Sequence, residues 1–368
     1  MENALRDGLR NLDLGLREAR AENATMTSLF AIEESVIALV QGGGAGAIAL
    51  AASLLFRSTT PPSLLEWIRV SQQEQRLQGD VAVAKARALA FDIINDFTSC
   101  AGVRNLREHA PQIITRCFDT ARREYDGEAK VMALRPLLLL CRAEAAAASS
   151  TSEHGDCFAG HANRSGEEDA LHRAAAAMHG VSARTIASEL TNDFKTNKTG
   201  KKTSSSSVKE MLLSVLGVLL RFHSNAVGKT LVQEIARIAA DRLFKETKHV
   251  TWKGQKFIAG ALRCLDGALS SQWGREQLLA SPIQVDGLKL RAKLYETIFV
   301  RAAVRQGHLY VTVSAALALI ARHAPLFDAE LGAEPERAAG KGGHLAVIAR
   351  LTDGEGAAAH ANKSDVRR

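Results

Sequence analysis

The sequence predicts an all-α protein, built as a HEAT- or armadillo-like α-solenoid of antiparallel helix pairs. The chain has 368 residues, of which 46% are hydrophobic but only 5% aromatic, a bias that favours helices over sheets. Apolar residues recur at intervals of three and four along nearly the whole chain, as they do on one face of a helix. Two helical segments follow per roughly forty residues, which is the period of such stacks. No crisp sequence repeat accompanies this spacing.

We expect residues 1–144 to form the first helical repeats. Helical spacing of apolar residues is found in four segments, which are Leu5 to Leu16, Leu64 to Ile93, Pro111 to Tyr125 and Lys130 to Ala145. Pro111 suits the first turn of its helix, where the missing N–H is not needed. Pro136 lies inside an apolar helical pattern and is expected to kink it.

The stretch from Ser35 to Phe56 carries no charge over 22 residues, which is long enough to cross a membrane. Its centre, "QGGGAG", is unsuited to the middle of a membrane helix and typical of a connector. We therefore predict two buried helices joined at Gln41 to Gly46, and no membrane association.

The remainder of the chain divides into three parts. Residues 145–168 are small, polar and rich in Gly and Ser, which predicts a disordered low-complexity insertion. Residues 169–332 are expected to form further helical repeats, with a basic Ser-rich loop at 196–207. Residues 333–368 are rich in Gly, Ala and charge, and are predicted to be a weakly ordered tail.

The most apolar segment follows the basic loop. Ser207 and Glu210 have the S-x-x-E spacing of a capping box, which predicts a helix that begins at Val208. Its apolar stripe consists of Leu212, Val215, Leu216, Leu219 and Phe222, and other faces are also apolar. Such a helix must be enclosed by neighbours. Further helices are expected at 231–243, 257–269, 288–305 and 308–324.

Two nucleotide-binding patterns are incomplete. "AVGKT" ends like a phosphate-binding loop, but His223 stands where the first glycine belongs and a helix precedes it in place of a strand. We predict a turn between helices at Gly228. Gly42, Gly44 and Ala47 have the spacing of a dinucleotide fingerprint, yet no alternation of strands and helices follows.

No catalytic or metal-binding constellation stands out, so we expect no enzyme activity, no cofactor and no metal. The sequence has no H-E-x-x-H, no G-x-S-x-G and no kinase catalytic loop. His154, Cys157 and His161 are close together, but they fall in the low-complexity insertion without the paired spacing of a zinc module. The five cysteines include no C-x-x-C pair, which favours a reducing, intracellular compartment.

The best binding candidate is the basic segment "KETKHVTWKGQK". The net charge of the chain is +7, which is compatible with a nucleic-acid partner. Lys245, Lys248, Lys253 and Lys256 flank Trp252, so lysines are available to phosphates and an indole to bases. The alternative is a solvated loop between helices with Trp252 half-buried.

A second basic loop carries the same two alternatives. It contains Lys201 and Lys202, preceded by Lys198, and leads into the serine run before Val208. Both loops are candidate DNA contacts.

Several stretches together resemble one family. "LREARAENATMTSLFAIEESVIALV", "APQIITRCFDTARREYDGEAKVMALRPLLLLCR" and, most specifically, "KKTSSSSVKEMLLSVLGVLLRFHSNAVGKTLVQEIARIAADRLFKE" resemble the amino-terminal region of the DNA-dependent protein kinase catalytic subunit, in the phosphatidylinositol-3-kinase-related kinase family. The resemblance covers roughly residues 5–330, with gaps. Residues 145–168 would be an insertion relative to the family, and the carboxy-terminal tail does not match.

The resemblance implies a nuclear protein of DNA damage repair that acts in non-homologous end joining. Its implied partners are double-stranded DNA ends, the Ku heterodimer and, if this chain is a fragment, the remainder of a large kinase polypeptide. The family's serine/threonine kinase domain lies far beyond the matching region, so a non-catalytic arm is expected. The alternative is a generic armadillo- or HEAT-like scaffold for protein–protein interaction.

Overall fold

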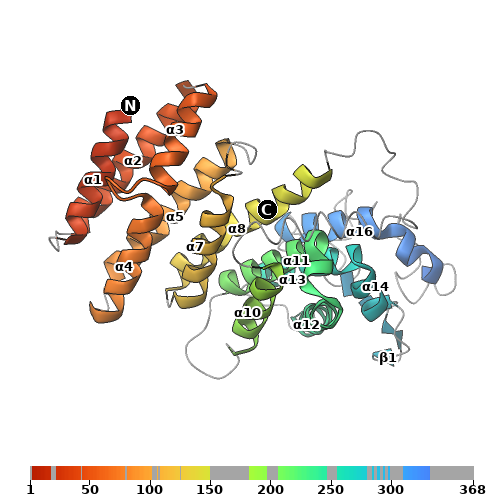
Figure 1. Ribbon diagram of the computed structural model, residues 1–368. Coiled ribbons are helices and arrows are strands. Elements are labelled where there is room, and N and C mark those ends of the chain that lie inside the picture. Colours follow the sequence, from red (N-terminus) through yellow and green to blue (C-terminus); the bar gives the residue numbers. More distant parts are fainter. Residues whose placement is uncertain are drawn as a thin grey trace, which may run out of the picture. The chain divides into compact units, whose positions relative to one another are not determined.

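The structure is a computed structural model of the 368-residue chain. It describes residues 2–17, 22–42, 44–78, 81–101, 106, 108–124, 126–149, 182–196, 206–246, 255–279, 284–285, 288–290, 293–294, 297–298 and 310–331. The described part is all-helical apart from one short hairpin, which confirms the prediction of an all-α protein. Figure 1 shows the helices in chain order.

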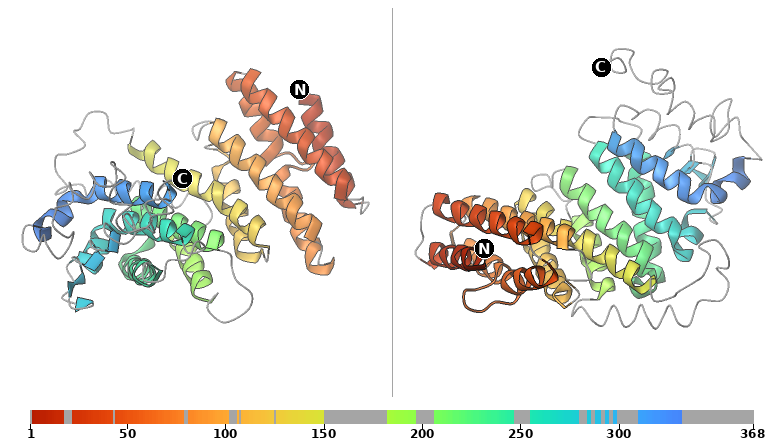
Figure 2. Two further views of the ribbon diagram at one scale, coloured as in Figure 1. Left: turned by 180° about the vertical axis from the view of Figure 1, so that it is seen from behind. Right: turned by 90° about the horizontal axis from the view of Figure 1, so that it is seen from above.

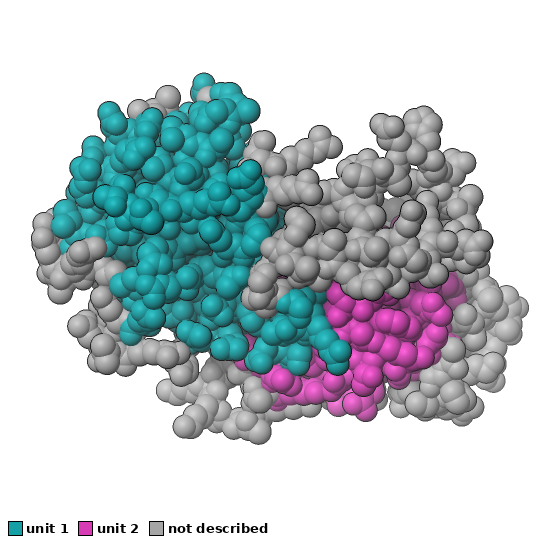
Figure 3. Space-filling model, in the orientation of Figure 1, with its two compact units in different colours: residues 1–189 teal, residues 190–368 magenta. Residues whose placement is uncertain are grey.

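The chain forms two compact units, Met1–Glu189 and Leu190–Arg368 (Figure 3). The helices of unit 1 are α1 (Glu2–Arg17), α2 (Glu22–Gly42), α3 (Ala45–Phe56), α4 (Leu64–Gln78), α5 (Val81–Ala101), α7 (Ala110–Arg123) and α8 (Gly127–Ser149). Helix α10 (Ala183–Thr196) spans the boundary. Unit 2 continues with α11 (Ser206–Val227), α12 (Lys229–Glu246), α13 (Gln255–Ser270), α14 (Gln272–Leu279), β1 (Gln284–Val285), β2 (Leu288–Lys289) and α16 (Tyr310–Leu331).

Unit 1 is arranged in two rows of helices, visible from both sides in Figures 1 and 2. Helix α5 packs on α2 and on α8, and α4 packs on α1 and on α7. Within the pairs, α1 packs on α2, α4 on α5 and α7 on α8, and α3 contacts the first pair and α4. The buried faces follow the predicted spacing, because Leu5, Leu9 and Leu12 of α1 are fully enclosed.

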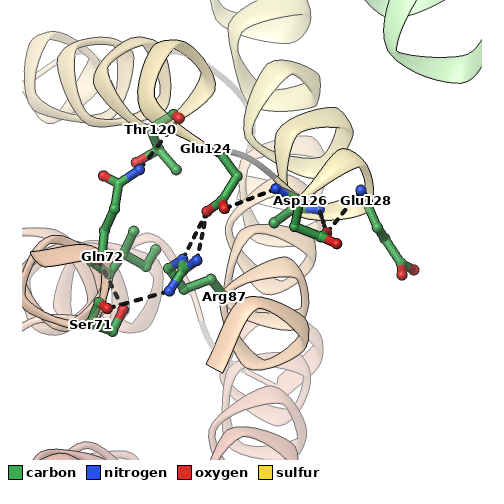
Figure 4. Close-up of polar contacts among 9 residues, drawn as sticks. Ser71, Gln72, Arg87, Thr120, Glu124, Asp126 and Glu128 are labelled. Carbon is green, nitrogen blue, oxygen red and sulfur yellow. Dashed lines mark hydrogen bonds and ion pairs between the residues drawn. The ribbon is translucent and has the colours of Figure 1, made fainter. Parts of the chain in front are cut away.

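A buried ion pair connects the second helix pair with the third. Arg87 of α5 donates from Nη2 to Oε2 of Glu124, 2.8 Å away, where Glu124 follows the last residue of α7. Arg87 Nη1 also donates to the carbonyl of Ser71 in α4, 3.4 Å away. Figure 4 shows Arg87 between these two acceptors. A buried charge without a partner is strongly unfavourable. Each of these two side chains is therefore stable in its buried position only while the other neutralises it.

Glu124 also orients the start of α8. Its Oε1 accepts a hydrogen bond from the backbone N–H of Asp126 at 3.2 Å. The carboxylate of Asp126 in turn accepts from the N–H groups of Glu128 and Ala129, which have no partner inside the helix (Figure 4). One buried carboxylate therefore connects α5, the end of α7 and the N-terminus of α8.

Unit 2 is built around a close approach of α11 and α13. A Cβ placed on Gly267 would lie 1.9 Å from the carbonyl oxygen of Gly217, so only glycine allows the two backbones this near. Gly260 makes a similar approach to Glu210. Helix α13 also packs on α12, α14 and α16, which makes it the central element of the unit.

The predicted turn between helices at Gly228 is confirmed. Gly228 separates α11 from α12 with a φ of +91°, a conformation that favours glycine, and its N–H donates to the carbonyl of Ser224. Lys229 begins α12 and pairs with Glu276 of α14 at 3.2 Å. The "GKT" sequence is thus a turn residue followed by the start of α12, and a helix precedes it where a phosphate-binding loop has a strand.

Two predictions about helix starts are wrong. Ser207 is the second residue of α11 and not its cap, because the helix begins at Ser206, and Glu210 instead binds Arg263 of α13 at 3.0 Å. The helix predicted from residue 288 is displaced at its start, because Leu288–Lys289 pair with Gln284–Val285 as a hairpin. At residue 288 the pairing of two short neighbouring strands replaces the start of the predicted helix.

The apolar segment around residue 41 forms α2 and α3, joined near the predicted connector. The prediction that the helices between Ser35 and Phe56 are buried is wrong in part, since Ile37 of α2 is 45% exposed and Ala45, Gly46 and Ala49 of α3 are also exposed. Phe30, which precedes that stretch in α2, is 49% exposed. The stretch Ala24–Gly42 has the length and the apolar composition of a helix that crosses a membrane. The inner face of α2 is nevertheless packed against α1 and α5.

Other predictions meet the structure only in part. Pro136 lies inside α8, which reaches Ser149 and so enters the first residues of the predicted insertion. The other residues of that insertion and the tail 333–368 lie outside the described residues, as do His154, Cys157 and His161. Among the described residues, no group of three His, Cys, Asp or Glu side chains is placed to hold a metal ion.

Candidate nucleic-acid interface

Two phenylalanines bring four helix ends of unit 2 together. Phe194 lies in the last turn of α10 and Phe257 in the first turn of α13. Their rings stack with centroids 6.0 Å apart and planes at 18°, and both side chains are buried. This contact fixes the end of α10 beside the start of α13.

Two cations complete the same cluster from the other two helices. Lys209, in the first turn of α11, places Nζ 5.9 Å from the centre of the Phe257 ring. Arg242, near the end of α12, places its guanidinium 5.6 Å from the centre of the Phe194 ring. Each cation is attracted by the negative face of an aromatic ring. The ends of α10 and α12 and the starts of α11 and α13 therefore lie at one end of unit 2.

Two of the lysines predicted from sequence belong to this end. Lys245 is in the last turn of α12 and Lys256 is the second residue of α13, and both are exposed. Lys248, Trp252 and Lys253 lie between them in the chain, outside the described residues. The stacking role expected of Trp252 stays a prediction.

The second predicted basic loop attaches to the same end. Lys201 and Lys202 also lie outside the described residues, but the helices before and after them, α10 and α11, end and begin in this cluster. The helix ends that border the two lysine-bearing connections therefore lie at one end of unit 2, although 41 residues of helix and turn, 206–246, separate the connections in the chain. This juxtaposition was not predicted from the sequence.

The side chains at this end carry charge of both signs, because the ends of α10 and α12 also include Asp193, Asp241 and Glu246. Lys195 is neutralised by Glu234, and Glu210 is engaged by Arg263. Within the described part of the chain, the remaining four cations have no carboxylate partner, and they are Lys209, Arg242, Lys245 and Lys256. Two helix N-termini and two C-termini meet here, so the helix dipoles oppose one another and the side-chain charges decide the sign.

We call this region the basic end of unit 2, defined by Phe194, Phe257 and those four cations. The phenylalanines are buried, so they position the helix ends and are closed to bases. Exposed ammonium and guanidinium groups bind phosphate oxygens at distances that do not depend on base identity. The arrangement suits a polyanionic backbone and offers no base-reading element among the described residues.

Sequence reasoning missed Phe194, Lys209, Arg242 and Phe257. Each lies in an ordinary amphipathic helix, where an aromatic residue at a buried position signals only core packing. The one available signal was that both basic loops are bordered by a phenylalanine, Phe194 before the first and Phe257 after the second.

The comparisons with known proteins identify no relative. No family model matches the sequence, and no curated protein or solved structure matches it either.

Proposed function

We propose that this chain is a non-catalytic helical arm that binds duplex DNA through the basic end of unit 2, without reading base sequence. The observation that carries the proposal is the stacking of Phe194 on Phe257, which brings helix ends that border both lysine-bearing connections to one place. Clustered cations release counterions when they meet a phosphate backbone, which is the main source of sequence-independent affinity.

The same proposal treats the helices as an α-solenoid. In unit 1, α4 and α7 begin at Leu64 and Ala110, 46 residues apart, and α5 and α8 also begin 46 residues apart, at Val81 and Gly127. Helix α10, which spans the boundary between the units, and α12 begin at Ala183 and Lys229, again 46 residues apart. This spacing is that of repeats built from helix pairs, each of which covers the apolar face of the next. Solenoids present extended surfaces whose edges are lined by loops between helices.

The biological setting rests on the resemblance of the sequence to the amino-terminal region of the DNA-dependent protein kinase catalytic subunit. On that basis the arm belongs to a nuclear protein of DNA double-strand break repair by non-homologous end joining. Its partners are then broken DNA ends, the Ku heterodimer and the remainder of a kinase polypeptide. Sequencing of the transcript beyond Arg368 tests this setting, and a downstream kinase domain is the expected result.

The DNA proposal is tested by fluorescence anisotropy with a blunt labelled duplex at several salt concentrations. We expect affinity to fall steeply with salt and to be nearly the same for duplexes of different sequence. Replacing Lys248, Lys253 and Lys256 with Glu weakens binding and lowers the salt slope by roughly one per lost phosphate contact. Replacing Lys201 and Lys202 acts in the same direction, more weakly.

A matched control changes the net charge equally at another place. Lys85, Arg122 and Arg123 are exposed residues of α5 and α7 in unit 1, and their replacement by Glu removes the same three positive charges. We expect this variant to keep most of the affinity. Equal losses of DNA affinity in the two triple variants would show that binding depends only on the net charge of the chain. A wild-type chain that binds no duplex at low salt would refute the proposal.

The second candidate function is a scaffold for protein–protein interaction. It is favoured by the exposed Phe30 and Ile37 on α2, since large apolar side chains left in solvent near one another mark contact surfaces. Binding to immobilised Ku that survives high salt and is lost on replacement of these two residues would favour this candidate over DNA binding.

A further inference from the structure

The outer face of α2 combines apolar and acidic side chains. Phe30 and Ile37 are the exposed large hydrophobic residues of the described chain. They are seven positions apart, so they lie on one side of the helix, about 10 Å from each other along its axis. Two smaller exposed residues extend the same side toward the two ends of the helix, and they are Thr27 and Gln41.

Negative charge lies between the two apolar residues. Glu33 and Glu34 occupy the positions three and four residues after Phe30, on the same side of α2. Asp92 and Asp96 of α5, which packs on α2, face Glu33 closely enough to act on its charge. Partial burial raises the pKa of Glu33, and the charges of Asp96, Asp92 and Glu34 raise it further.

Most of this charge is not neutralised within the described part of the chain. Asp92 pairs with Arg135 of α8 at 3.2 Å. Asp96 accepts a hydrogen bond from the neutral amide of Asn95, and α2 itself contains no lysine or arginine. Glu33, Glu34 and Asp96 therefore form an acidic group on a chain whose net charge is +7.

We propose that the acidic–apolar face of α2, formed by Phe30, Glu33, Glu34 and Ile37 with Asp96 of α5, docks a basic amphipathic helix of a partner protein. A helix that presents apolar residues one or two turns apart fills the ends of this face. Lysines or arginines next to those residues meet the carboxylates between them. Apolar anchors supply most of the affinity in such contacts, and complementary charge fixes register and partner choice.

The charges select this occupant over two others. Nucleic acid and anionic membrane surfaces are both negative, and they are repelled by the three carboxylates. A membrane-spanning role for α2 would place Glu33 and Glu34 near the middle of the bilayer and would strip Leu29, Ile32 and Leu39 from their packed positions. The inference is independent of DNA binding at the basic end of unit 2.

The test uses the full chain and a synthetic peptide of about 18 residues, enough for five helical turns. The peptide carries leucines at helical spacing and lysines beside them, and a scrambled peptide of the same composition serves as the control ligand. We expect the ordered peptide to bind at least about tenfold more tightly than the scrambled one, by fluorescence anisotropy at physiological salt. Equal binding of the two peptides would overturn the proposal, and so would no binding of the ordered peptide.

Two double variants separate the apolar and charged contributions. Phe30→Ala with Ile37→Ala, and Glu33→Gln with Glu34→Gln, are each expected to lower affinity about tenfold or more, which corresponds to about 1.4 kcal/mol. Glu128→Gln with Asp241→Asn removes two exposed carboxylates elsewhere and is expected to change nothing. Unchanged binding in both α2 variants would overturn the proposal.

Hydrogen exchange locates the bound peptide without mutation. Slower exchange is expected in α2 and α5, and protection confined to unit 2 would contradict the assignment. Two further measurements test for other occupants. Binding to vesicles of phosphatidylcholine and phosphatidylserine tests for a membrane, and sedimentation of the chain alone tests for a second copy of this chain. Vesicle binding or dimer formation that is lost in the Phe30→Ala, Ile37→Ala variant would replace the partner helix by a membrane or by a second copy of this chain.

Discussion

Arg87 and Glu124 form an ion pair that is removed from solvent on both sides. Their side chains are 0% and 2% exposed, and they come from α5 and from the residue that follows α7. Both hydrogen bonds from Arg87 to Glu124 reach the same carboxylate oxygen, at 3.0 and 2.8 Å, which leaves the other oxygen for the backbone of Asp126. The pair therefore holds the second and third helix pairs of unit 1 in register (Figure 4).

Replacing Arg87 with Met is expected to destabilise unit 1 by about 3–5 kcal/mol, because Glu124 is then a buried charge without its counterion. Replacing both residues, Arg87→Met with Glu124→Leu, is expected to cost less than the single change. Urea unfolding of the two single variants and the double variant measures the coupling. The exposed pair Arg10–Asp7 serves as the control, since Arg10→Met should stay within about 0.5 kcal/mol of wild type. Purely additive effects at Arg87 and Glu124 would contradict the buried pair.

Gly267→Ala is expected to destabilise unit 2 by about 1–3 kcal/mol or more. The added methyl group meets the backbone of Gly217, which cannot move aside without separating α11 from α13. Gly46→Ala in α3 is the matched control. No atom lies within 4 Å of that Cβ position, so alanine should stabilise the helix by about 0.5–1 kcal/mol. Urea unfolding compares the two, and a neutral Gly267→Ala would show that the helices are farther apart.

Asp266 predicts how the stability of unit 2 depends on acid. Burial alone would raise the pKa of this carboxyl group, but hydrogen bonds and positive charge from His323 and Arg322 of α16 outweigh it and hold the pKa below its usual value. A depressed pKa in the folded state contributes stability at pH values above the unfolded value of about 4, and that stability is lost as the pH falls through the folded pKa.

We therefore expect Asp266→Asn to lower the thermal midpoint at pH 7 and to flatten the decline of that midpoint as the pH falls below about 4. Thermal unfolding followed by circular dichroism at a series of pH values measures both effects. Asp241→Asn, an exposed carboxylate of α12, is the control and should follow the wild-type curve. If the thermal midpoint of the wild type rises as the pH falls through this range, the contacts of Asp266 with His323 and Arg322 do not stabilise the charged carboxylate.

The cysteines are expected to differ in reactivity. Burial raises the pKa of Cys264 to about 12 and also raises that of Cys117, so neither forms the reactive thiolate at neutral pH. Cys100 is exposed. Brief iodoacetamide treatment followed by peptide mass spectrometry should modify Cys100 in the native protein, and Cys117 and Cys264 only in urea. Native labelling of Cys264 would mean that the contact of α13 with α11 opens readily.

The sequence alone determined part of the local structure. The 3–4 spacing of apolar residues identified the buried faces of α1 and α11, because a helix brings positions three and four apart onto one side. Gly228 was predicted as a turn, because glycine adopts a positive φ without a steric penalty. These features depend on neighbours in the chain, so a local pattern contains them.

Only the tertiary structure decided the features that depend on distant residues. Arg87 and Glu124 are 37 positions apart, and nothing near either residue specifies the other. The basic end of unit 2 exists because Phe194 meets Phe257, which brings together the ends of two helices that are distant in the sequence. Ile37 was predicted as a buried position from the sequence and faces solvent in the structure, because α2 has neighbours on one side only and its apolar surface extends beyond that side. Which faces of an apolar helix are covered is set by how the other helices pack, and periodicity within a single helix carries no record of that packing.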